Sequence, residues 1–352
     1  MSWTVAGQER AVATLARAVR AGRVSHAYLF AGPKHTGKTL AALQFAQALN
    51  CTGQEPPCAR CRQCERIAAM AHPDIEIVTI GSPVCDAPAG ESHDHSKDAS
   101  RDIRICQVRR LGRLVSRAPY EGRYRVLIVE PADAMNETAA NALLKTLEEP
   151  PPQVVLILIT DREEQLLETI RSRARRVAFA GLPKAVVERA LRERWDVDPS
   201  RAAELARLSG GRLGWAVLAL HDERVLERLH AALDEAQAIA CAPLAERFRA
   251  AGTLGSGFTR DRAGTRATLE AWQAFWRDLL LIAAGREDAA VHRDRLDALR
   301  PLAAQCGVAG AARAVRALTD ARQQLDENAS PVLALEVMML ALPQLHPSAA
   351  PA

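Results

Sequence analysis

The chain has 352 residues, of which 48% are hydrophobic and 4% aromatic, and its formal net charge is +4. This length and apolar content are enough for two or three domains with buried cores, which excludes a disordered scaffold. A mild positive charge permits contact with nucleic acid without predicting it. The sequence has no leader-like start and no apolar run near the ~20 residues of a membrane span, so we expect a cytoplasmic protein without membrane contact.

Strand-like apolar runs alternate with helical patterns over residues 1–180, most clearly at 27–30, 125–129 and 154–159. Such runs are typical of a parallel sheet that helices cover on both faces. We therefore predict an α/β domain over residues 1–180. A polar segment at 81–100 lacks periodicity and is interpreted as an exposed insertion in this domain.

Residues 32–39 read G-P-K-H-T-G-K-T and form a complete phosphate-binding loop between the first strand and a helical stretch at 40–49. The glycines let backbone N–H groups converge on phosphate oxygens, the second lysine neutralises phosphates, and the last threonine can hold Mg²⁺. The sequence thus predicts a site for ATP with Mg²⁺, rather than a glycine-rich turn that binds nothing. The candidate residues are Gly32, Gly37, Lys38 and Thr39.

Hydrolysis depends on two further acidic residues, which sites of this kind have at the end of a strand. The first is an Asp that binds Mg²⁺, and the second is a Glu that orients or deprotonates the attacking water. Here the strand at 125–129 is followed by Glu130 and Pro131. Glu130 could take the metal side, but Pro131 cannot orient or deprotonate water, and losing such a base costs roughly 10²–10⁴-fold in rate. We expect nucleotide binding without efficient turnover. A second interpretation stays open, in which Glu130 and Asp133 only cap a helix that begins near Asn136.

Four cysteines within residues 51–64 have the spacing C-x6-C-x2-C-x2-C. Thiols in a reducing compartment bind metal more readily than they form structural disulfides, and four thiolates complete a tetrahedral Zn²⁺ shell. We predict a structural zinc module over about residues 50–66, held by Cys51, Cys58, Cys61 and Cys64. His93 and His95, in the polar insertion, are better explained as solvated loop residues.

Strand signals stop after residue 181, and helical patterns follow to the C-terminus. Asp198 and Pro199 form a typical helix start. We predict a small helical lid domain at 181–221 and an all-helical collar domain at 222–352. The helical segments expected here are 184–194, 199–208, 263–284, 308–326 and 331–342.

The chain resembles the clamp-loader branch of AAA+ proteins over almost its whole length. Residues 25–30 (SHAYLF) lead into the phosphate-binding loop, and residues 139–151 (AANALLKTLEEPP) are similar to a segment typical of these subunits. The cysteines also follow the helix after this loop, as in the family. The resemblance places Val5 and Gln8 in the box near the adenine and gives Thr160 the position of the sensor-1 polar residue.

Residues 172–174 read S-R-A and match the Ser-Arg-Cys motif of the family with its last residue changed. The resemblance implies that Arg173, next to Ser172, supplies an arginine finger to ATP bound on a neighbouring subunit. The sensor-2 arginine of active loaders would align near Gly214 and is missing, with Arg212 as a partial substitute. These departures favour the delta-prime type of subunit, and a gamma/tau ATPase motor is the alternative.

The resemblance also implies a hetero-oligomer within the DNA polymerase III holoenzyme, with gamma/tau and delta subunits, the sliding clamp and primer-template DNA as partners. No polymerase site of its own and weak or no intrinsic ATPase activity are expected. Residues 101–125 contain eight arginines against two acidic residues, which suits DNA phosphates. Arginine is abundant throughout the chain, so a solvated basic face is equally favoured. A stand-alone zinc module that binds nucleic acid is the least favoured function.

Overall fold

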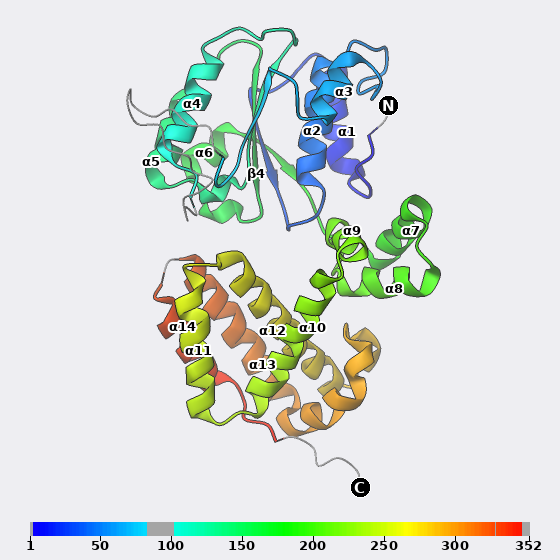
Figure 1. Ribbon diagram of the computed structural model, residues 1–352, viewed down its shortest axis with the longest axis vertical. Coiled ribbons are helices and arrows are strands. Elements are labelled where there is room, and N and C mark those ends of the chain that lie inside the picture. The colour runs from blue at the N-terminus through cyan, green and yellow to red at the C-terminus, as the bar shows by residue number, and fades with distance from the viewer. Residues whose placement is uncertain (1–2, 83–101, 328, 347–352) are drawn as a thin grey trace. The chain divides into compact units, whose positions relative to one another are not determined.

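The computed structural model describes residues 3–82, 102–327 and 329–346. The chain forms two compact units, Met1–Val217 and Leu218–Ala352 (Figure 1). The predicted limits of the lid and collar domains, 181–221 and 222–352, stay predictions. Residues 83–100 of the predicted insertion, with His93 and His95, lie outside the described residues.

Five parallel strands form one sheet in the order β2-β3-β4-β1-β5, so the predicted parallel α/β domain is confirmed. The three predicted runs are the central strands, and every residue in them is buried. Two edge strands, β2 and β5, were not named from the sequence. The strands are β1 Ala27–Ala31, β2 Ile75–Val78, β3 Arg125–Val129, β4 Val154–Thr160 and β5 Arg175–Ala178.

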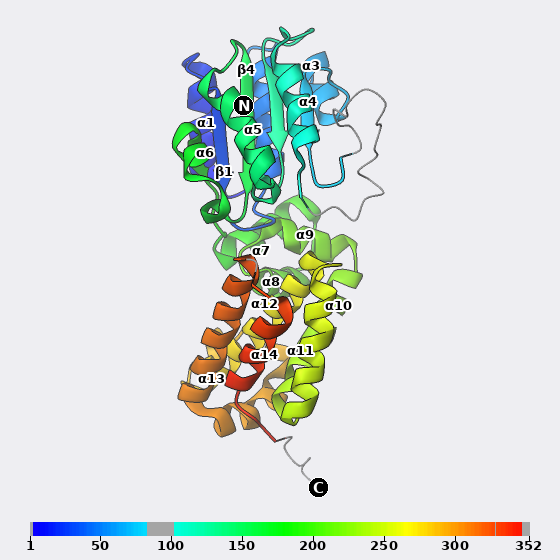
Figure 2. The ribbon, with the colours of Figure 1, turned by 90° about the vertical axis from the view of Figure 1, so that its left-hand side faces the viewer.

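Helices cover both faces of the sheet (Figures 1 and 2), with α1, α2 and α3 on one face and α4, α5 and α6 on the other. Tyr28 of β1 and Phe45 of α2 pack edge to face on the first side, with ring centroids 4.9 Å apart. The second side is aliphatic, with Leu111, Leu127 and Leu143 buried. The helices are α1 Glu9–Arg20, α2 Lys38–Asn50, α3 Arg62–Ala68, α4 Ile105–Val115, α5 Glu137–Glu148 and α6 Glu168–Arg173.

The strands all run the same way, which gives the sheet two distinct edges. The register aligns Ala31 with Thr160 and Ala178, so the segments that follow β1, β4 and β5 meet at one edge, the carboxyl edge. Tyr28 aligns with Arg175 toward the other edge, the amino edge. Helices α2 and α5 follow strands and return the chain to the amino edge. The phosphate-binding loop therefore lies at the carboxyl edge, and the cysteines after α2 lie at the amino edge.

Three helices complete the first unit and lead into the second: α7 Lys184–Trp195, α8 Pro199–Leu208 and α9 Leu213–His221. The Asp198 carboxylate accepts hydrogen bonds from the N–H groups of Ser200 (2.9 Å) and Arg201 (3.2 Å), which confirms the predicted start of α8. Short 3₁₀ turns lie at Ala132–Ala134, Glu163–Gln165, Glu287–Ala289 and Arg293–Arg295.

The second unit is a helical bundle whose core includes Trp272, Phe275 and Trp276 of α12. Its buried Arg247 donates to the carbonyl oxygens of Leu342 (2.8 Å) and Ala240 (2.9 Å) and so joins three segments. Within the described residues, no helix is long and apolar enough to cross a membrane. The helices are α10 Arg224–Cys241, α11 Leu244–Phe258, α12 Arg262–Ala283, α13 Leu296–Asp326 and α14 Pro331–Ala341.

Candidate nucleotide and metal sites

The conformation of the phosphate-binding loop depends on its two glycines. Gly32 has φ 150°, and a Cβ added there would lie 2.0 Å from the carbonyl oxygen of Phe179, so no other residue fits. Gly37 has φ 89°, in the left-handed region that favours glycine, and α2 begins directly after it. The loop therefore needs glycine at two positions, at Gly32 because the backbone of Phe179 lies so close and at Gly37 because the backbone is left-handed.

The ammonium group of Lys38 lies inside this loop. Its Nζ donates to the carbonyl oxygens of Gly32 and Pro33, each at 2.7 Å, and the residue is buried. Burial lowers the pKa of Lys38, and the carboxylates of Asp161 and Glu130 oppose this shift. The lysine thus has hydrogen-bond partners within its own loop and acidic groups at the same edge of the sheet.

The two predicted Mg²⁺ ligands lie side by side at the carboxyl edge. The Thr39 hydroxyl donates to Glu130, with distances of 2.7 and 2.9 Å to the two carboxylate oxygens. Helix α5 is capped by Asn136, whose Oδ1 accepts from the N–H of Ala139 at 2.9 Å. The interpretation that Glu130 and Asp133 merely cap this helix is therefore wrong.

Thr160, at the end of β4, belongs to a polar cluster at the same edge. Its hydroxyl donates to Asp133 at 2.6 Å and accepts from the backbone N–H of Arg162 at 2.9 Å, while the Arg162 guanidinium pairs with the other Asp133 oxygen. Asp161 lies 3.8 Å from the Nζ of Lys34. Asp161 and Arg162 were not predicted from the sequence, although their position directly after the buried strand β4 could have indicated them.

Gln8 and Val5 connect the N-terminal segment to the phosphate-binding loop. The Gln8 amide donates to the carbonyl oxygens of Thr36 (3.3 Å) and Ala180 (2.7 Å), so it joins the loop to the chain that follows β5. Val5 is buried, and its Cγ1 lies 3.3 Å from a Cβ placed at Gly37. Both residues predicted for the adenine box thus contact the loop that precedes α2.

Gly214, the predicted sensor-2 position, lies against the loop and carries no side chain. Its N–H donates to the carbonyl oxygen of His35 at 2.8 Å, and an added Cβ would lie 2.8 Å from the same oxygen. The Nε of Arg212 donates to the carbonyl oxygen of Ser209 at 3.0 Å, which uses this nitrogen within its own turn. The partial sensor-2 role of Arg212 stays a prediction.

Arg173 lies at the opposite edge of the sheet. It ends α6 just before β5, and the four residues of β5 span about 13 Å toward the carboxyl edge. Its side chain is 38% exposed, pairs with the exposed Glu148 at 3.0 Å and donates to the carbonyl oxygen of Thr169 at 3.1 Å. The Ser172 hydroxyl donates to the same carbonyl. The structure does not bring Ser172 and Arg173 together with this chain's own phosphate-binding loop.

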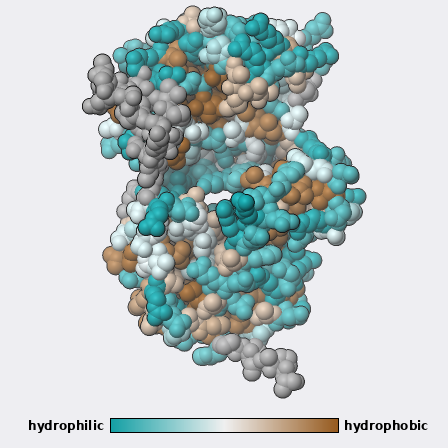
Figure 3. All heavy atoms as spheres, in the orientation of Figure 1, coloured by the Kyte–Doolittle hydropathy of each residue, from teal (hydrophilic) through white to brown (hydrophobic). Residues whose placement is uncertain are grey.

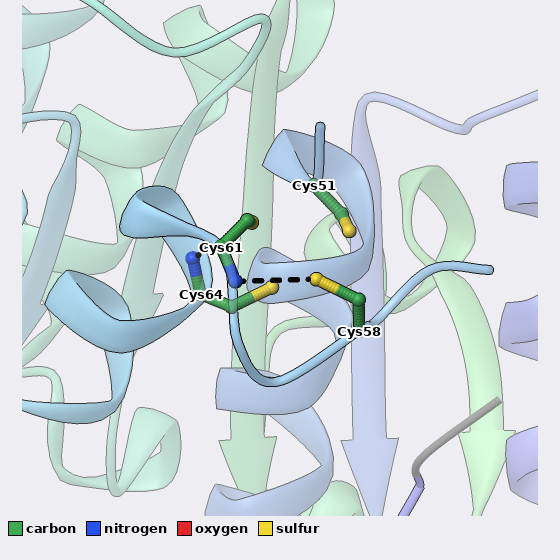
Figure 4. Close-up of side chains that lie close together, drawn as sticks. All are labelled: Cys51, Cys58, Cys61 and Cys64. Atoms are coloured by element: carbon green, nitrogen blue, oxygen red, sulfur yellow. Dashed lines mark hydrogen bonds between the residues drawn. The ribbon is translucent and has the colours of Figure 1, made fainter. Parts of the chain in front are cut away.

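The four cysteines of the predicted zinc module converge between the end of α2 and the start of α3 (Figure 4). Their Sγ atoms all lie within 4.8 Å of one another, and Cys51 and Cys64 are buried. Four sulfurs around a Zn²⁺ ion with bonds near 2.3 Å stand about 3.8 Å apart, so the cluster needs only a small contraction. These residues fit a structural metal ion.

Hydrogen bonds lower the pKa of Cys58 and Cys61 toward the thiolate form that binds metal, whereas burial raises the pKa of Cys51 and Cys64. The N–H of Gly53 lies 3.3 Å from the Cys51 sulfur, and the N–H of Cys61 lies 3.3 Å from the Cys58 sulfur. Burial raises the pKa of Cys61, but hydrogen bonds from Thr52 and Cys64 outweigh it and bring the value to about 6. A thiolate at this position at neutral pH suits Zn²⁺.

Near the zinc module at the amino edge, the buried carboxylate of Asp74 holds the loop between α4 and β3. It accepts from the N–H groups of Tyr120 (2.6 Å), Glu121 (2.9 Å) and Gly122 (2.8 Å) and from the Arg125 guanidinium (2.9 Å). Burial raises the pKa of Asp74, but these hydrogen bonds outweigh it and lower the value to about 2. The loop 116–124 therefore has a fixed backbone.

The comparisons with known proteins decide the family. The model of the family described as DNA polymerase III, delta subunit, matches residues 7–183. The DNA polymerase III subunit delta' of Bacillus subtilis is 30% identical over 95% of this chain and 96% of its own length. The chain belongs to the DNA polymerase III delta-prime family. The membership predicted from the sequence is thereby confirmed.

Other curated relatives and a solved structure are also similar to this chain. The delta' subunit of Pseudomonas aeruginosa is 35% identical over 64% of this chain and 66% of its own length. A gamma/tau subunit of Mycobacterium tuberculosis is 31% identical over 99% of this chain, which spans 61% of that longer protein. Among solved structures, a gamma subunit-related protein of Thermotoga maritima is 18% identical, with a TM-score of 0.39 and coverage of 94% and 97%.

Proposed function

We propose that this chain is a delta-prime-type subunit of a DNA polymerase III clamp loader that binds ATP without efficient hydrolysis and supplies Arg173 in trans. The observation that carries the proposal is that Arg173 lies at the amino edge, whereas the phosphate-binding loop of the same chain lies at the carboxyl edge. From the amino edge the guanidinium serves a nucleotide bound to a neighbouring subunit rather than one bound to this chain. The proposed partners are gamma/tau and delta subunits, the sliding clamp and primer-template DNA.

Weak hydrolysis is supported by two positions beside the phosphate-binding loop. Pro131 follows Glu130 and offers no group that accepts a proton from water. Gly214 contacts the loop through its backbone alone, so no side-chain cation reaches the phosphates from that position. Lys38, Thr39 and Glu130 are all in place, which supports binding of ATP with Mg²⁺.

Assembly with other subunits is supported by an apolar stripe on α14. Leu333, Val337 and Leu340 are 61%, 60% and 60% exposed within the second unit, and they are the exposed residues of this helix. Their spacing of four and three residues places them on one face. Figure 3 shows hydrophobic residues on the surface where α14 lies. An apolar stripe of this kind is typical of a protein interface.

The proposal is tested with Arg173→Ala in a reconstituted clamp loader. DNA-stimulated hydrolysis at the neighbouring site, measured in a single turnover, should fall on the order of 10³-fold, since an arginine finger contributes about 10³–10⁵. Arg176→Ala is the matched control, because Arg176 is an exposed arginine in the same segment that pairs with Glu163. If complexes with Arg173→Ala loaded clamps at the normal rate, the proposed role of Arg173 in trans would be wrong.

The gamma/tau-type motor is the second candidate, because a gamma/tau relative matches 99% of this chain. Steady-state ATP hydrolysis by the isolated chain separates the two functions. Rapid hydrolysis that Lys38→Ala abolishes would assign the motor function, whereas nucleotide binding with little turnover supports the delta-prime type.

A further inference from the structure

Gln63 lies at the start of α3, between two of the four cysteines, and its amide group bonds to residues outside the zinc module. Its Oε1 lies 2.7 Å from Nε2 of His72, and its Nε2 donates to the carbonyl oxygen of Glu121 at 3.4 Å. A residue held between two predicted metal ligands thus contacts the loop 116–124, at a position 58 residues later in the chain.

The hydrogen bonds of His72 determine which way the Gln63 amide is oriented. The imidazole is buried, and its Nδ1 accepts from the backbone N–H of Asp74 at 3.1 Å. Burial lowers the pKa of His72, so the ring is neutral at neutral pH and carries its single proton on Nε2. Nε2 therefore donates to Oε1 of Gln63, and the amide nitrogen is left to donate to Glu121. Because Asp74 also accepts from three N–H groups of the loop, these residues form one continuous hydrogen-bond network.

Two further contacts join the zinc module to the same loop. Arg66 of α3 pairs with the carboxylate of Glu121. At the other end of the module, Asn50 directly precedes the first cysteine, and its Oδ1 accepts from the N–H of Tyr124 at 2.9 Å. The loop is therefore held on both sides of Gly122 by residues that lie within two positions of a cysteine of the cluster.

Gly122 fits closely against the end of α2. A Cβ added at this position would lie 2.6 Å from Oδ1 of Asn50 and 3.3 Å from Oδ2 of Asp74. Asn50 is only 1% exposed, and its Nδ2 donates to the carbonyl oxygen of Ala46 at 3.2 Å, so its amide is fixed on both sides. The loop and the zinc module are thus packed without room for one additional methyl group.

The segment that carries Gln63 has little apolar interior of its own. Within residues 51–66 the buried residues are Cys51, Pro57 and Cys64, two of which are predicted metal ligands. Helix α3 has seven residues, too few to be stable alone, and Ile67 anchors only its far end in the core. The position of Gln63 therefore depends on a metal ion that holds the cysteines together.

We propose that metal binding by the zinc module fixes the loop 116–124, and that Gln63, Arg66 and Asn50 are the positioning residues that connect the two. A coupling between two sites is reciprocal, so the contacts with the loop strengthen metal binding by the same factor by which the metal stabilises the loop. The inference rests on the predicted metal site and is independent of the ATP site and of Arg173.

The first test is amide hydrogen exchange of the full chain, measured by mass spectrometry with zinc bound and after a chelator with a thiol reductant has removed it. Exchange at residues 120–124 should rise about tenfold without the metal, as expected when one or two protecting hydrogen bonds are lost. Strand β4 is the internal reference, because it lies between β3 and β1 in the sheet. Loop exchange that is the same with and without zinc would overturn the coupling.

Gln63→Met tests the connection while zinc stays bound. Methionine has a similar length but makes neither hydrogen bond, so exchange at residues 120–124 should again rise about tenfold although the four cysteines are intact. This variant decides the question if removal of zinc unfolds the whole first unit. Gln44→Met is the matched control, because Gln44 is a buried glutamine of α2 whose amide donates to Thr4 Oγ1 at 2.6 Å. Unchanged loop exchange in Gln63→Met would contradict the proposal.

The reciprocal test changes the loop and measures the metal. Gly122→Ala should displace Asn50 and lower the affinity for zinc about tenfold in competition with a chromophoric chelator. Gly112→Ala of α4 is the matched control, since nothing lies within 4 Å of a Cβ at that position. If Gly122→Ala unfolds, the zinc affinity of Gln63→Met is measured in its place.

Elemental analysis of the wild type separates the two ways in which the inference can fail. Protein that contains no zinc would show that the metal site itself is wrong. Protein that contains zinc, and whose Gly122→Ala variant is folded and keeps the full affinity, would show that the loop and the metal are not coupled.

Discussion

The two edges of one parallel sheet are built in opposite ways. At the carboxyl edge, Lys38 and Thr39 have hydrogen-bond partners within the chain, and Lys38 is buried while Thr39 is half-buried. At the amino edge, Arg173 is 38% exposed and Tyr120 is 82% exposed, and the backbone N–H of Tyr120 donates to Asp74. The side chains at the carboxyl edge are thus arranged within one chain, whereas the amino edge has large side chains that remain exposed to solvent. Four measurements test this difference between the two edges.

The largest expected effect concerns the predicted Zn²⁺ site at the amino edge. Structural Zn²⁺ sites contribute roughly 10 kcal/mol or more to local folding, so Cys61→Ser should release zinc and loosen residues 51–68. Elemental analysis should find about one Zn²⁺ in the wild type and far less in the variant. Cys306→Ser, a half-buried thiol of the second unit, should keep it. Wild-type protein purified without chelator and free of zinc would refute the metal site.

Lys38→Ala tests the carboxyl edge. A buried ammonium that meets phosphate through charge-assisted hydrogen bonds is worth about 2.7 kcal/mol, so affinity for a fluorescent ATP analogue should fall about 100-fold. Lys34→Ala is the control, because Lys34 belongs to the same loop but is 51% exposed. The zinc content should not change, since the cysteines lie at the other edge. If Lys38→Ala kept its affinity for the ATP analogue, the predicted nucleotide site at the carboxyl edge would be wrong.

Asp74 tests whether the loop around Tyr120 is held as the geometry indicates. Its pKa of about 2 in the folded chain is below the ordinary 3.8, so its stabilisation is present above pH 4 and is lost as pH falls toward 2. Asp74→Asn should lower the free energy of unfolding by about 2 kcal/mol at pH 7.

Urea unfolding of the wild type and of Asp74→Asn at pH 7 and pH 3 measures this difference. The gap should shrink at pH 3, because the Asp74 carboxyl is then mostly protonated in the unfolded chain while it is still ionised in the folded chain. Any loss of zinc affects both proteins alike. The control is Asp234→Asn, which changes an aspartate that is 70% exposed and pairs with Arg295. An equal gap at both pH values would contradict the role given to Asp74.

The smallest expected effect concerns the ion pair between Arg173 and Glu148. Both side chains are exposed, at 38% and 52%, and exposed pairs contribute at most about 1 kcal/mol. Glu148→Gln should therefore change the free energy of unfolding by no more than about 0.5 kcal/mol in a urea titration. A loss well above 1 kcal/mol would mean that Arg173 serves this chain's fold rather than a partner.

The sequence predicted the features that local patterns encode. The buried strands β1, β3 and β4 are continuous apolar runs, and the cysteine spacing indicated the zinc module. The edge strands were not named, because β2 is half-buried and three of the four residues of β5 are exposed, which leaves no apolar run. The segment predicted to begin at 308 is the second part of α13, because non-helical backbone at Gly307, with φ 59° and ψ 178°, interrupts this helix.

Contacts between distant residues could not be predicted in this way. Asp74 is an isolated acidic residue in the sequence, and its role depends on N–H groups almost fifty positions later. The motif identified Lys38 and Thr39, but the pairing of Thr39 with Glu130 joins the start of α2 to the residue after β3 and needed the structure. The family resemblance supplied Arg173, and only the register of β5 showed at which edge it lies.

The contact between Gly214 and His35 limits how this subunit could be re-engineered. Placing a glutamate at position 131 and an arginine at position 214 is the obvious plan for raising its rate of ATP hydrolysis. Any side chain at 214 would begin 2.8 Å from the His35 carbonyl oxygen, with the backbone N–H of 214 already bonded to that oxygen. Gly214→Arg would therefore push α9 away from the phosphate-binding loop. The connection between α8 and α9 would have to be redesigned before this substitution could raise the rate of hydrolysis.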